Sequence, residues 1–370
     1  MSTLFSPFAL RSLVLPNRIA ISPMCQYSAD HGKATAWHLL HLGHLALSGA
    51  ALLCLEATAV EPDGRITSAD LGLWDDATQT ALVPVLAAIR QHSKIAVVVQ
   101  LAHAGRKASS HAPWDGGQQV PLAQGGWLAH APSAVPQKDG ELAPQALDAA
   151  GLLRVRDAFV AAARRAEHLG IDGIELHAAH GYLMHSFLSP ISNQRTDAYG
   201  GSLENRMRFP LELFAAVRAA FPAHKPVGIR VSASDWVAGG WDIDQTITFA
   251  QELKKLGVDW IDVSSGGISP LQKIPLTAGY QVPFAQAIKA ATGLPTMAVG
   301  LITEPQQAED IVASGQADMV ALGRAMLYDP RWPWHAAAAL SATIQAPPQY
   351  WRSAPHGLNS IFGKTVLGGR

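Results

Sequence analysis

Short apolar runs recur along the chain, and stretches with the spacing of amphipathic helices lie between them. Most of these runs lack alternating polar positions, which is typical of parallel strands that are buried on both faces. We therefore predict strands over Arg18–Ser22, Ala51–Glu56, Ile95–Gln100, Gly173–Leu176, Val227–Val231, Trp260–Val263, Thr296–Val299 and Met319–Leu322. Helices are predicted over Asp157–Leu169, Leu211–Ala220, Thr246–Leu256 and Gln306–Ser314.

Glycines follow several of the predicted helices at the position where a C-cap is expected, at Gly170, Gly257 and Gly315. Eight strand–helix units in one chain predict an α/β fold, the (β/α)8 TIM barrel. A doubly wound sheet is the alternative topology. A sheet of that kind that binds a dinucleotide normally carries an early G-x-G-x-x-G turn, and the chain has no such turn.

Polar and unusual residues stand directly after the ends of the predicted strands. Barrel active sites are built at the rim formed by the carboxyl ends of the strands, so this placement favours the barrel and locates its site. The residues concerned are Met24-Cys25-Gln26-Tyr27, Glu56-Ala57-Thr58, Gln100, His177, Arg230, Ser264-Ser265-Gly266, Gly300 and Gly323-Arg324.

The domain organisation is predicted to be one barrel domain over residues 1–370. The segment 102–149 is rich in Gly, Pro, Trp and Gln and lacks the periodic apolar residues of a second core, so we expect an excursion over the barrel mouth. The segment 345–370 carries Tyr350-Trp351-Arg352 after two prolines. It is interpreted as a tail that anchors at a subunit interface, where Trp, Tyr and Arg are favoured, or as a loosely docked tail.

Composition limits the class of protein. Hydrophobic residues make up 48% of the 370 residues and charged residues 15%, which excludes a disordered chain. The formal net charge of −1 gives no basic field for nucleic acid or an anionic membrane. Two cysteines, Cys25 and Cys54, do not form a disulfide framework, and the first residues lack a signal-peptide pattern. We expect a cytoplasmic protein that does not bind a membrane.

His177, His180 and Tyr182 follow a predicted buried strand. Two neighbouring imidazole N–H groups can bind and polarise one carbonyl oxygen, and a phenol can donate a proton. The alternatives are structural histidines or two ligands of a metal ion, although no third ligand stands at a standard spacing. The same H-x-x-H spacing occurs at His38 and His41, where we expect partly buried helix histidines, so the spacing alone is unspecific.

Other rim residues each have a functional and a structural interpretation. Cys25 is a thiol that touches a cofactor, or a small buried hydrophobe, whereas Cys54 is assigned to the core. Gly300 and Gly323-Arg324 follow the last two predicted strands, where barrels often bind phosphate; the alternative is two tight turns with a surface arginine. Arg230 ends a buried strand and requires an anionic or hydrogen-bonding partner.

These motifs together resemble the Old Yellow Enzyme family of FMN-dependent ene-reductases, and within it the thermophilic-like or xenobiotic-reductase-like group. The resemblance runs nearly from end to end of the chain. It rests on Pro16–Ile19, Ser22–Tyr27, Glu56–Thr58, Gln100–Lys107, His177–Tyr182, Arg195–Arg206, Ser264–Gly266, Gly279–Pro283 and Gly323-Arg324.

The resemblance implies a role for each matching residue. The residues implied to contact the flavin ring are Ser22, Pro23, Met24, Cys25 and Ala57. Gln100 and Arg230 are implied to form hydrogen bonds with the pyrimidine side of the ring. The residues implied to bind the phosphate are Gly300, Gly323 and Arg324. Substrate contacts fall to Tyr27, His177, His180, Tyr182 and, from a neighbouring subunit, Trp351 or Arg352. His177 and His180 are implied to bind the activating oxygen of the substrate and Tyr182 to be the proton donor. Cys25 stands where other branches of the family carry Thr, and is implied to tune the flavin potential.

The activity that the resemblance implies is a ping-pong reaction. NADPH or NADH gives hydride to FMN, and the hydride then passes to the β-carbon of an activated alkene while the α-carbon is protonated. The substrate classes implied are α,β-unsaturated ketones, aldehydes, imides and nitro compounds. A homodimer or a higher even oligomer is expected because C-terminal residues reach a neighbouring site in this group.

Three other functions account less well for the sequence. A barrel aldolase or isomerase needs a lysine at a strand end, whereas Lys107 and Lys273 lie in loops or beyond strands. A larger reductase with an iron–sulfur cluster needs a cysteine-rich ligand run, which two cysteines cannot supply. A non-enzymatic binding barrel does not account for polar residues gathered at one rim.

Overall fold

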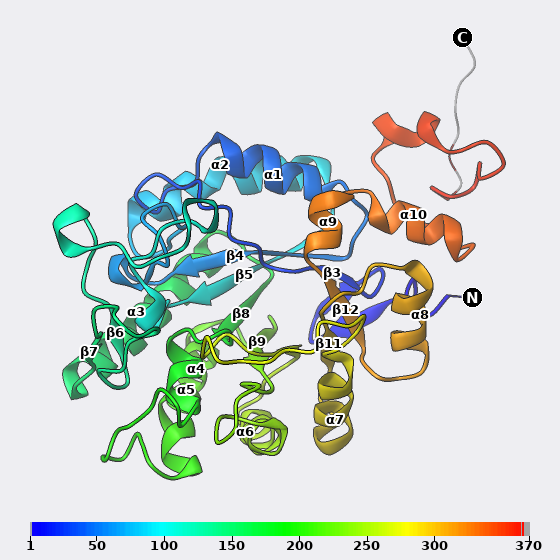
Figure 1. Cartoon of the computed structure of the whole chain (residues 1–370). Helices are drawn as coiled ribbons and strands as arrows, with labels where there is room; N and C mark the ends of the chain where they lie inside the picture. Colours follow the sequence, from blue (N-terminus) through cyan, green and yellow to red (C-terminus); the bar gives the residue numbers. More distant parts are fainter. Residues whose placement is uncertain (1, 364, 366–370) are drawn as a thin grey trace.

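Eight parallel strands close into a barrel in the computed structural model, which describes residues 2–363 and 365 (Figure 1). Each strand pairs with the next along the chain, and the last pairs with the first. The strands are β3 (Ile19–Ile21), β4 (Leu52–Ala59), β5 (Ala96–Ala102), β8 (Gly173–Ala178), β9 (Val227–Ser232), β10 (Ile261–Ser264), β11 (Thr296–Ala298) and β12 (Met319–Leu322). The predicted TIM barrel is therefore confirmed, and the doubly wound sheet is excluded.

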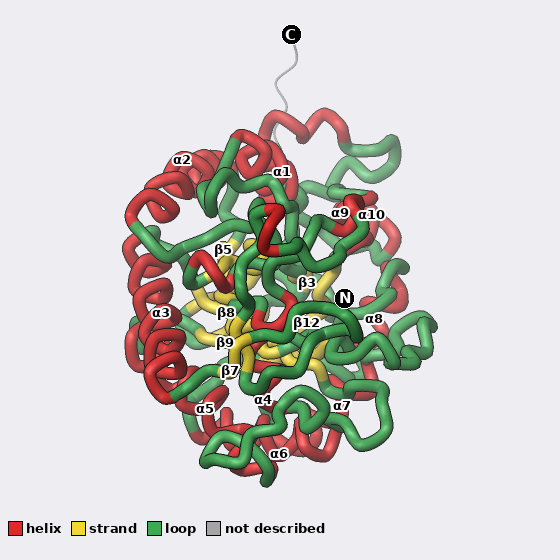
Figure 2. Tube along the Cα trace, turned by 60° about the vertical axis from the view of Figure 1, so that its left-hand side comes forward, coloured by secondary structure: helices red, strands yellow, loops and turns green. Residues whose placement is uncertain are grey.

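Helices surround the barrel and shield the outer faces of its strands (Figure 2). They are α1 (Ala36–Ala46), α2 (Asp76–His92), α3 (Ala149–His168), α4 (Leu183–Leu188), α5 (Leu203–Ala220), α6 (Ile243–Lys255), α7 (Val282–Thr292), α8 (Pro305–Ala313), α9 (Arg324–Tyr328) and α10 (Trp332–Ala339). The glycines predicted at helix ends adopt the left-handed conformation, with φ of +68° at Gly170, +83° at Gly257 and +76° at Gly315.

Two helices begin earlier than the hydrophobic pattern predicts. Helix α3 begins after Asp148, whose carboxylate accepts a hydrogen bond from the Gly151 amide at 2.7 Å. Helix α5 begins after Ser202, whose hydroxyl accepts a hydrogen bond from the Asn205 amide, although the pattern placed its start at Leu211. In the structure Pro210 is buried inside the helix, so packing of that face outweighs the lost hydrogen bond.

Apolar side chains form separate layers inside and outside the barrel wall. The inner layer includes Cys54, Val98, Trp260 and Met297, and it confirms the assignment of Cys54 to the core. Leu10 and Leu15 of the antiparallel hairpin β1 (Phe8–Leu10) and β2 (Leu13–Leu15) join this layer. The inner layer is a packed core, so any site must lie above it, at the carboxyl end of the strands.

Strand register brings polar side chains of the upper barrel to the same level. Gln100 of β5 is opposite Glu175 of β8, and Arg230 of β9 is opposite both His177 of β8 and Asp262 of β10. Because residues two apart point to the same face of a strand, Glu175 and His177 share the inner face. Four neighbouring strands therefore contribute to one polar layer above the apolar core.

The segment 102–149 contains several short helical turns and the small sheet of β6 (His130–Ala131) and β7 (Gln145–Ala146). The Trp114 ring packs edge-on against Tyr27 with the ring centroids 5.5 Å apart. The Trp127 indole donates a hydrogen bond to the Asp63 carbonyl at 3.0 Å. These contacts attach the segment to loops that follow β3 and β4.

The C-terminal segment packs against α10, outside the ring of helices, as the red part of Figure 1 shows. Trp334 of α10 contacts Tyr350 and Phe362, with ring centroids 5.6 Å and 5.0 Å away. Within residues 2–363 and 365, no helix combines the length and the apolar character needed to cross a bilayer.

Candidate active site

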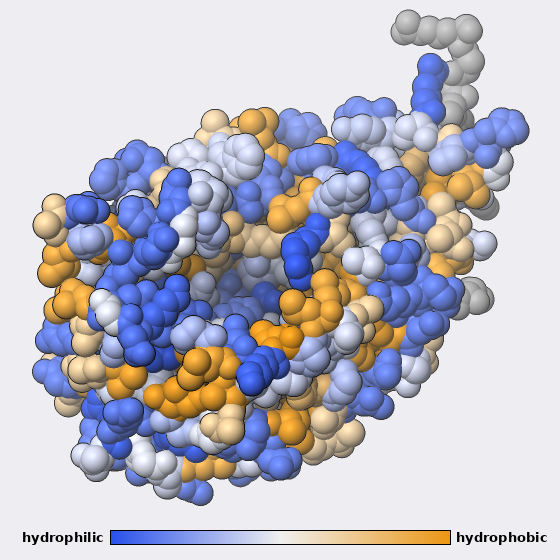
Figure 3. Space-filling model, in the orientation of Figure 1, coloured by the Kyte–Doolittle hydropathy of each residue, from blue (hydrophilic) through white to orange (hydrophobic). Residues whose placement is uncertain are grey.

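A hollow opens in the middle of the molecule, and hydrophilic residues are visible at its floor (Figure 3). The His177 ring lies 5.2 Å from the His180 ring and 4.8 Å from the Tyr182 ring, measured between centroids, and both contacts are edge-on. His177 is the last residue but one of β8, and Tyr182 is the N-cap of α4. The three side chains that the sequence singled out therefore form one cluster at the end of the strand.

The turn between His177 and Tyr182 has an unusual backbone. His180 has a φ of +60° and Gly181 a φ of +77°, so two successive residues are left-handed. A non-glycine residue in this region costs roughly 1 kcal/mol or more, and contacts outside the turn must compensate. Such contacts exist at both ends of His180: its amide donates to Ser232 Oγ at 2.9 Å, and its carbonyl accepts from Lys107 Nζ at 2.6 Å.

Hydrogen bonding fixes which nitrogen of His177 carries a proton. The Ala179 amide donates to His177 Nδ1 at 3.2 Å, so the proton of the neutral ring is on Nε2. Burial and the nearby Arg230 lower the pKa of His177 and of His180 well below the usual value. Both rings are neutral at pH 7, and His177 Nε2–H is left as a donor for a ligand.

His180 is held by the end of β10. Its Nε2 lies 2.6 Å from Ser264 Oγ, which leaves Nδ1 as the ring nitrogen for a ligand. The Ser265 hydroxyl donates to Gln281 Oε1 at 2.7 Å, and the Gln281 amide donates to the Val299 carbonyl at 2.9 Å. The Gln281 side chain thus connects the loop after β10, next to the histidine's partner Ser264, to the loop after β11.

Tyr182 is in a setting that keeps its phenol protonated. Burial, followed by the acidic groups of Cys25 and Tyr27, raises the pKa of Tyr182 well above its usual value. The Lys107 ammonium lies 5.4 Å from the centroid of the Tyr182 ring. Burial and the neighbouring Arg106 lower the pKa of Lys107 to about 8. A neutral phenol in this position is a proton donor rather than an acceptor.

Cys25 and Tyr27 lie on the loop after β3, beside one another. Tyr27 has a φ of +48°, and its hydroxyl contacts the Cys25 thiol. Burial, followed by the carboxylates of Asp70 and Glu56, raises the pKa of Cys25 well above its usual value. Cys25 remains partly exposed, so this thiol is available for contact but is not a thiolate at pH 7.

Gln100 and Arg230 belong to a buried network below the cluster of His177, His180 and Tyr182. Gln100 Nε2 donates to Glu175 Oε1 at 2.8 Å, and Arg230 Nε lies 3.2 Å from Asp262 Oδ2. Burial and the neighbouring Asp262 raise the pKa of Glu175 to about 8. Burial also raises the pKa of Asp262. One arginine thus faces two buried carboxyl groups, and Glu175 holds its proton at pH 7.

Gly300, Gly323 and Arg324 meet at the other side of the rim, after β11 and β12. Gly300 has a φ of +113°, and a Cβ there would lie 2.6 Å from Gln281 Nε2, so this position requires glycine. A Cβ on Gly323 would lie 3.6 Å from Met24 Sδ and 3.8 Å from Ser22 Cβ. The phosphate residues of the prediction therefore adjoin the loop after β3 that carries Ser22, Pro23 and Met24.

These residues fit FMN because several of their hydrogen-bond donors and acceptors have no partner among the described residues. Within the described part of the chain, no residue accepts from the Arg324 guanidinium or from the Nη atoms of Arg230, and none donates to Gln100 Oε1. Ser22 Oγ is buried and without a partner among the described residues. A phosphate suits an exposed arginine beside a glycine turn, and a pyrimidine ring edge suits an amide oxygen beside a guanidinium.

Two of the residues predicted to contact the substrate lie away from the other predicted residues within the fold of a single chain. Trp351 and Arg352 lie in the short helix Pro348–Ser353, on the outer side of α10 (Figure 1). The Trp351 indole donates to the Ala346 carbonyl at 3.0 Å. The fold does not bring them to the hollow of the same chain. Ala57, by contrast, lines a small void together with Tyr182.

Several residues without a role predicted from the sequence lie at the site in the structure, namely Lys107, Glu175, Asp262, Ser264 and Gln281. Glu175 and Asp262 carried a usable signal, because a charge in the middle of an otherwise apolar strand requires a partner. Ser264 carried a signal of position, because it stands at the end of a predicted strand, but its partner and that of Gln281 are distant in sequence. Within residues 2–363 and 365 no cluster of three or more His, Cys, Asp or Glu side chains suits a metal ion.

Comparisons with known proteins agree with this geometry. The model of the NADH:flavin oxidoreductase / NADH oxidase family matches residues 3–342. An NADPH dehydrogenase of Geobacillus thermodenitrificans is 43% identical over 353 residues, which cover 95% of this chain and 98% of that protein. An NADPH dehydrogenase of Listeria innocua is 42% identical over 355 residues, which cover 95% and 99% of the two chains.

Solved structures show the same likeness. Morphinone reductase superimposes with a TM-score of 0.77 at 27% identity, covering 94% of this chain and 91% of that chain. A complex of morphinone reductase with tetrahydroNAD superimposes with a TM-score of 0.76 at 27% identity, covering 94% and 93% of the two chains. The match extends over nearly the whole of each chain, so it concerns the complete barrel with its rim loops.

Proposed function

The chain belongs to the NADH:flavin oxidoreductase / NADH oxidase family, that of the Old Yellow Enzymes, and from this premise we propose that it reduces activated carbon–carbon double bonds. The family makes it an NAD(P)H-dependent FMN oxidoreductase. The proposed substrates are α,β-unsaturated ketones, aldehydes, imides and nitro compounds, which share an electron-withdrawing group with an oxygen atom that accepts hydrogen bonds.

The observation that carries the proposal is the pair of neutral imidazoles beside a protonated phenol. His177 presents Nε2–H to the hollow because its Nδ1 is occupied, and His180 stands edge-on to it. Two neutral donors suit one carbonyl or nitro oxygen, which gains negative charge as the double bond accepts hydride. The Tyr182 ring packs edge-on against His177, so its phenol is the candidate donor of a proton to the carbon atom that becomes basic.

The residues that would hold FMN divide into two groups. Gln100 and Arg230 would bind the pyrimidine side of the ring, with Ser22, Pro23, Met24, Cys25 and Ala57 along the ring. Gly300, Gly323 and Arg324 would bind the phosphate. FMN, when bound, supplies the transfer of hydride from the nicotinamide to the substrate.

The chain's own residues then act on the substrate. His177 and His180 bind its oxygen and withdraw electron density, which makes the β-carbon electrophilic. Tyr27 and the Trp114 ring beside it limit how the substrate lies in the hollow. Tyr182 donates its phenolic proton to the α-carbon. The depressed pKa values of the two histidines keep them from replacing Tyr182 as the acid.

The proposal is tested with the FMN-loaded protein under anaerobic conditions. NADPH should bleach the flavin absorbance, and 2-cyclohexen-1-one should restore it. A double variant His177→Ala, His180→Ala should keep the bleaching step and slow the recovery by roughly a hundredfold or more, because two charge-stabilising hydrogen bonds are lost. His92→Ala, which removes an exposed histidine at the end of α2, is the matched control. Recovery at the normal rate in the double variant would refute the role of the pair.

We also propose a homodimer or higher even oligomer in which the C-terminal segment of one subunit contributes Trp351 or Arg352 to the hollow of its neighbour. The position of this segment outside the helix ring of its own chain supports the proposal (Figure 1). Light scattering of the purified protein measures the oligomer. Trp351→Ala and Arg352→Ala, measured separately, identify which residue alters KM for 2-cyclohexen-1-one; a monomer with full activity would contradict a shared site.

A further inference from the structure

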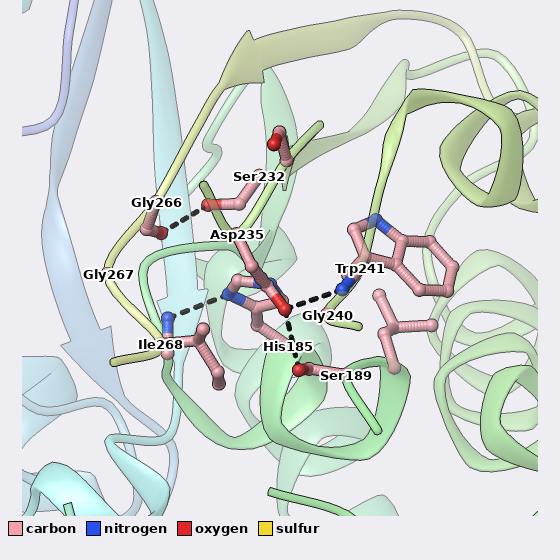
Figure 4. A network of polar contacts seen from close by, with 12 residues as sticks. His185, Ser189, Ser232, Asp235, Gly240, Trp241, Gly266, Gly267 and Ile268 are labelled. Carbon is pink, nitrogen blue, oxygen red and sulfur yellow. Dashed lines mark hydrogen bonds and ion pairs between the residues drawn. The ribbon is translucent and has the colours of Figure 1, made fainter. Parts of the chain in front are cut away.

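His185 and Asp235 form a buried pair (Figure 4). The His185 ring contacts Gly181, in the turn that carries His180 and Tyr182. Both side chains are fully buried, and His185 Nε2 lies 2.9 Å from Asp235 Oδ1, at an angle oblique for a hydrogen bond. His185 belongs to α4 and Asp235 to the loop between β9 and α6. Neither side chain reaches the hollow, and the proposed reaction uses neither.

The other nitrogen of His185 holds the backbone of the turn. The Gly181 amide donates to His185 Nδ1 at 2.8 Å, so this nitrogen is unprotonated and the ring proton is on Nε2. Gly181 is the second of the two left-handed residues, with a φ of +77°. The imidazole therefore joins the carboxylate of one loop to the strained backbone of another.

Asp235 is fixed as a carboxylate. Its Oδ2 accepts hydrogen bonds from Ser189 Oγ and from the Trp241 amide, each at 2.7 Å. Burial alone raises the pKa of Asp235, but the neighbouring His185 ring and these hydrogen bonds hold it below its usual value. Gly240 leaves room for this arrangement, since a Cβ there would lie 2.7 Å from Asp235 Oδ2. A negative charge beside Nε2 keeps the ring proton on that nitrogen.

The turn is also confined from the opposite side. The His180 amide donates to Ser232 Oγ at 2.9 Å, and Ser232 Oγ donates to the Gly266 carbonyl at 2.8 Å. A Cβ on Gly267 would lie 2.4 Å from the His180 Cα, so the two backbones touch. The amides of both left-handed residues are thus satisfied by side chains, His180 by Ser232 and Gly181 by His185.

The same arrangement recurs at a second rim loop. The Thr35 amide donates to His38 Nδ1 at 3.0 Å, and His38 Nε2 lies 3.3 Å from Glu56 Oε1. Glu56 Oε2 accepts a hydrogen bond from the Gln26 amide at 2.9 Å, next to the left-handed Tyr27. Two rim loops are therefore stabilised in the same way. In each, a buried histidine accepts a hydrogen bond from a backbone amide at Nδ1 and has Nε2 near a carboxylate.

We propose that His185 and Asp235 are positioning residues: Asp235 selects the Nε2–H tautomer of His185, and His185 Nδ1 then holds the Gly181 amide so that His180 and Tyr182 face the hollow. The inference rests on the proposed function, because it concerns the hydrogen bonds from His177 and His180 to a ligand oxygen. It predicts that ligand affinity depends on the Nδ1 acceptor rather than on the stability of the pair.

Two substitutions of His185 test the contact of Nδ1 and the contact of Nε2 separately. The amide oxygen of Asn stands close to the position of Nδ1, and the amide nitrogen of Gln stands close to the position of Nε2. His185→Asn retains an acceptor for Gly181 and loses the contact with Asp235, whereas His185→Gln retains that contact and loses the acceptor. Ser189→Ala is the matched control, since it removes a hydrogen bond to Asp235 and leaves His185 in place.

The measurement is the dissociation constant of 4-nitrophenol for the FMN-loaded enzyme, by calorimetry, with the thermal midpoint measured in parallel. His185→Gln should weaken binding at least tenfold, whereas His185→Asn and Ser189→Ala should stay within threefold of the wild type even where their thermal midpoints fall. Equal affinities for His185→Gln and the wild type, or an equal loss in His185→Asn, would overturn the proposal.

A second measurement uses the wild-type enzyme and so does not depend on the folding of a variant. In ¹⁵N-histidine-labelled protein at pH 7, His185 should show a protonated Nε2 and an unprotonated Nδ1; the opposite tautomer would overturn the proposal. Wild-type enzyme that does not bind 4-nitrophenol would count against the proposed function instead, since the tautomer of His185 is observed without a ligand.

Discussion

His180 Nε2 and Ser264 Oγ lie 2.6 Å apart, and the direction of the proton between them decides what His180 can offer a ligand. If Ser264 donates, the neutral ring carries its proton on Nδ1 and can donate to a ligand oxygen. The other acceptor near Ser264, Gln281 Oε1, is 3.4 Å away and already accepts from Ser265 at 2.7 Å. The short contact therefore favours donation from Ser264 to His180.

Ser264→Ala is expected to weaken the binding of 4-nitrophenol by about fivefold, because it removes the hydroxyl that favours the donor tautomer of His180 and one hydrogen bond is worth about 1 kcal/mol. Ser264→Thr keeps a hydroxyl and should bind normally. Ser265→Ala is the control, since Ser265 contacts Gln281 and not the histidine. Calorimetry measures the affinities, and an unchanged value in Ser264→Ala would show that the hydroxyl does not set the tautomer.

Glu175 is expected to make stability depend on pH. Its pKa is raised to about 8 in the folded chain, whereas a glutamate in an unfolded chain titrates near about 4.3. The stabilising contribution of the protonated form is complete below the unfolded value and is lost as pH rises towards 8. The free energy of unfolding should therefore fall between pH 5 and pH 8, with a slope of at most about 1.4 kcal/mol per pH unit.

The check compares urea unfolding of the wild type and Glu175→Gln at pH 5.5, 7 and 8.5. The difference between the two proteins should change with pH, because glutamine does not titrate. Glu252→Gln, at an exposed ion pair with Lys255, should show no such change. A constant difference between wild type and Glu175→Gln would mean that Glu175 is ionised throughout.

Cys25 is expected to react slowly with alkylating reagents at neutral pH. Burial and two nearby carboxylates raise its pKa, and each unit of increase lowers the thiolate fraction about tenfold. Iodoacetamide at pH 7.5 should modify Cys25 at least about tenfold more slowly than free cysteine, with a faster rate at pH 9.5. Mass spectrometry of the digested protein follows the site, and Cys54, buried in the barrel, serves as the unreactive reference. Rapid labelling at pH 7.5 would contradict a protonated Cys25.

Arg324→Ala is expected to weaken FMN binding by roughly ten- to a hundredfold, the effect of losing one charge-assisted contact to a phosphate. Riboflavin, which has the ring without the phosphate, should bind the variant and the wild type equally. Equilibrium dialysis of both ligands against the apoprotein separates these outcomes. A parallel loss of riboflavin affinity would show that Arg324 supports the ring site rather than the phosphate.

Much of the fold was predictable because parallel strands that are buried on both faces require continuous apolar runs, which the sequence shows. All eight predicted barrel strands coincide with an observed one to within a few residues, and β12 agrees exactly at both ends. Helix starts were less predictable: the starts of α3 and α5 depend on the caps Asp148 and Ser202, and on a proline that the core accepts. The rim position of the site also followed from the sequence, because polar residues at strand ends have no place in the core.

The sequence by itself determined the barrel, the family and the residue types at the rim, because apolar runs and local motifs lie within a few neighbouring positions. Only the tertiary structure decided the environment of each copy of a repeated motif. His177 and His38 share the same H-x-x-H spacing, yet His177 packs against His180 and Tyr182 with no partner for Nε2 among the described residues, and His38 is fully buried against Glu56. The tautomers depend on partners far along the chain: Ser264 lies 84 residues from His180. Such hydrogen bonds exist only after the barrel has closed, so no local pattern can encode them.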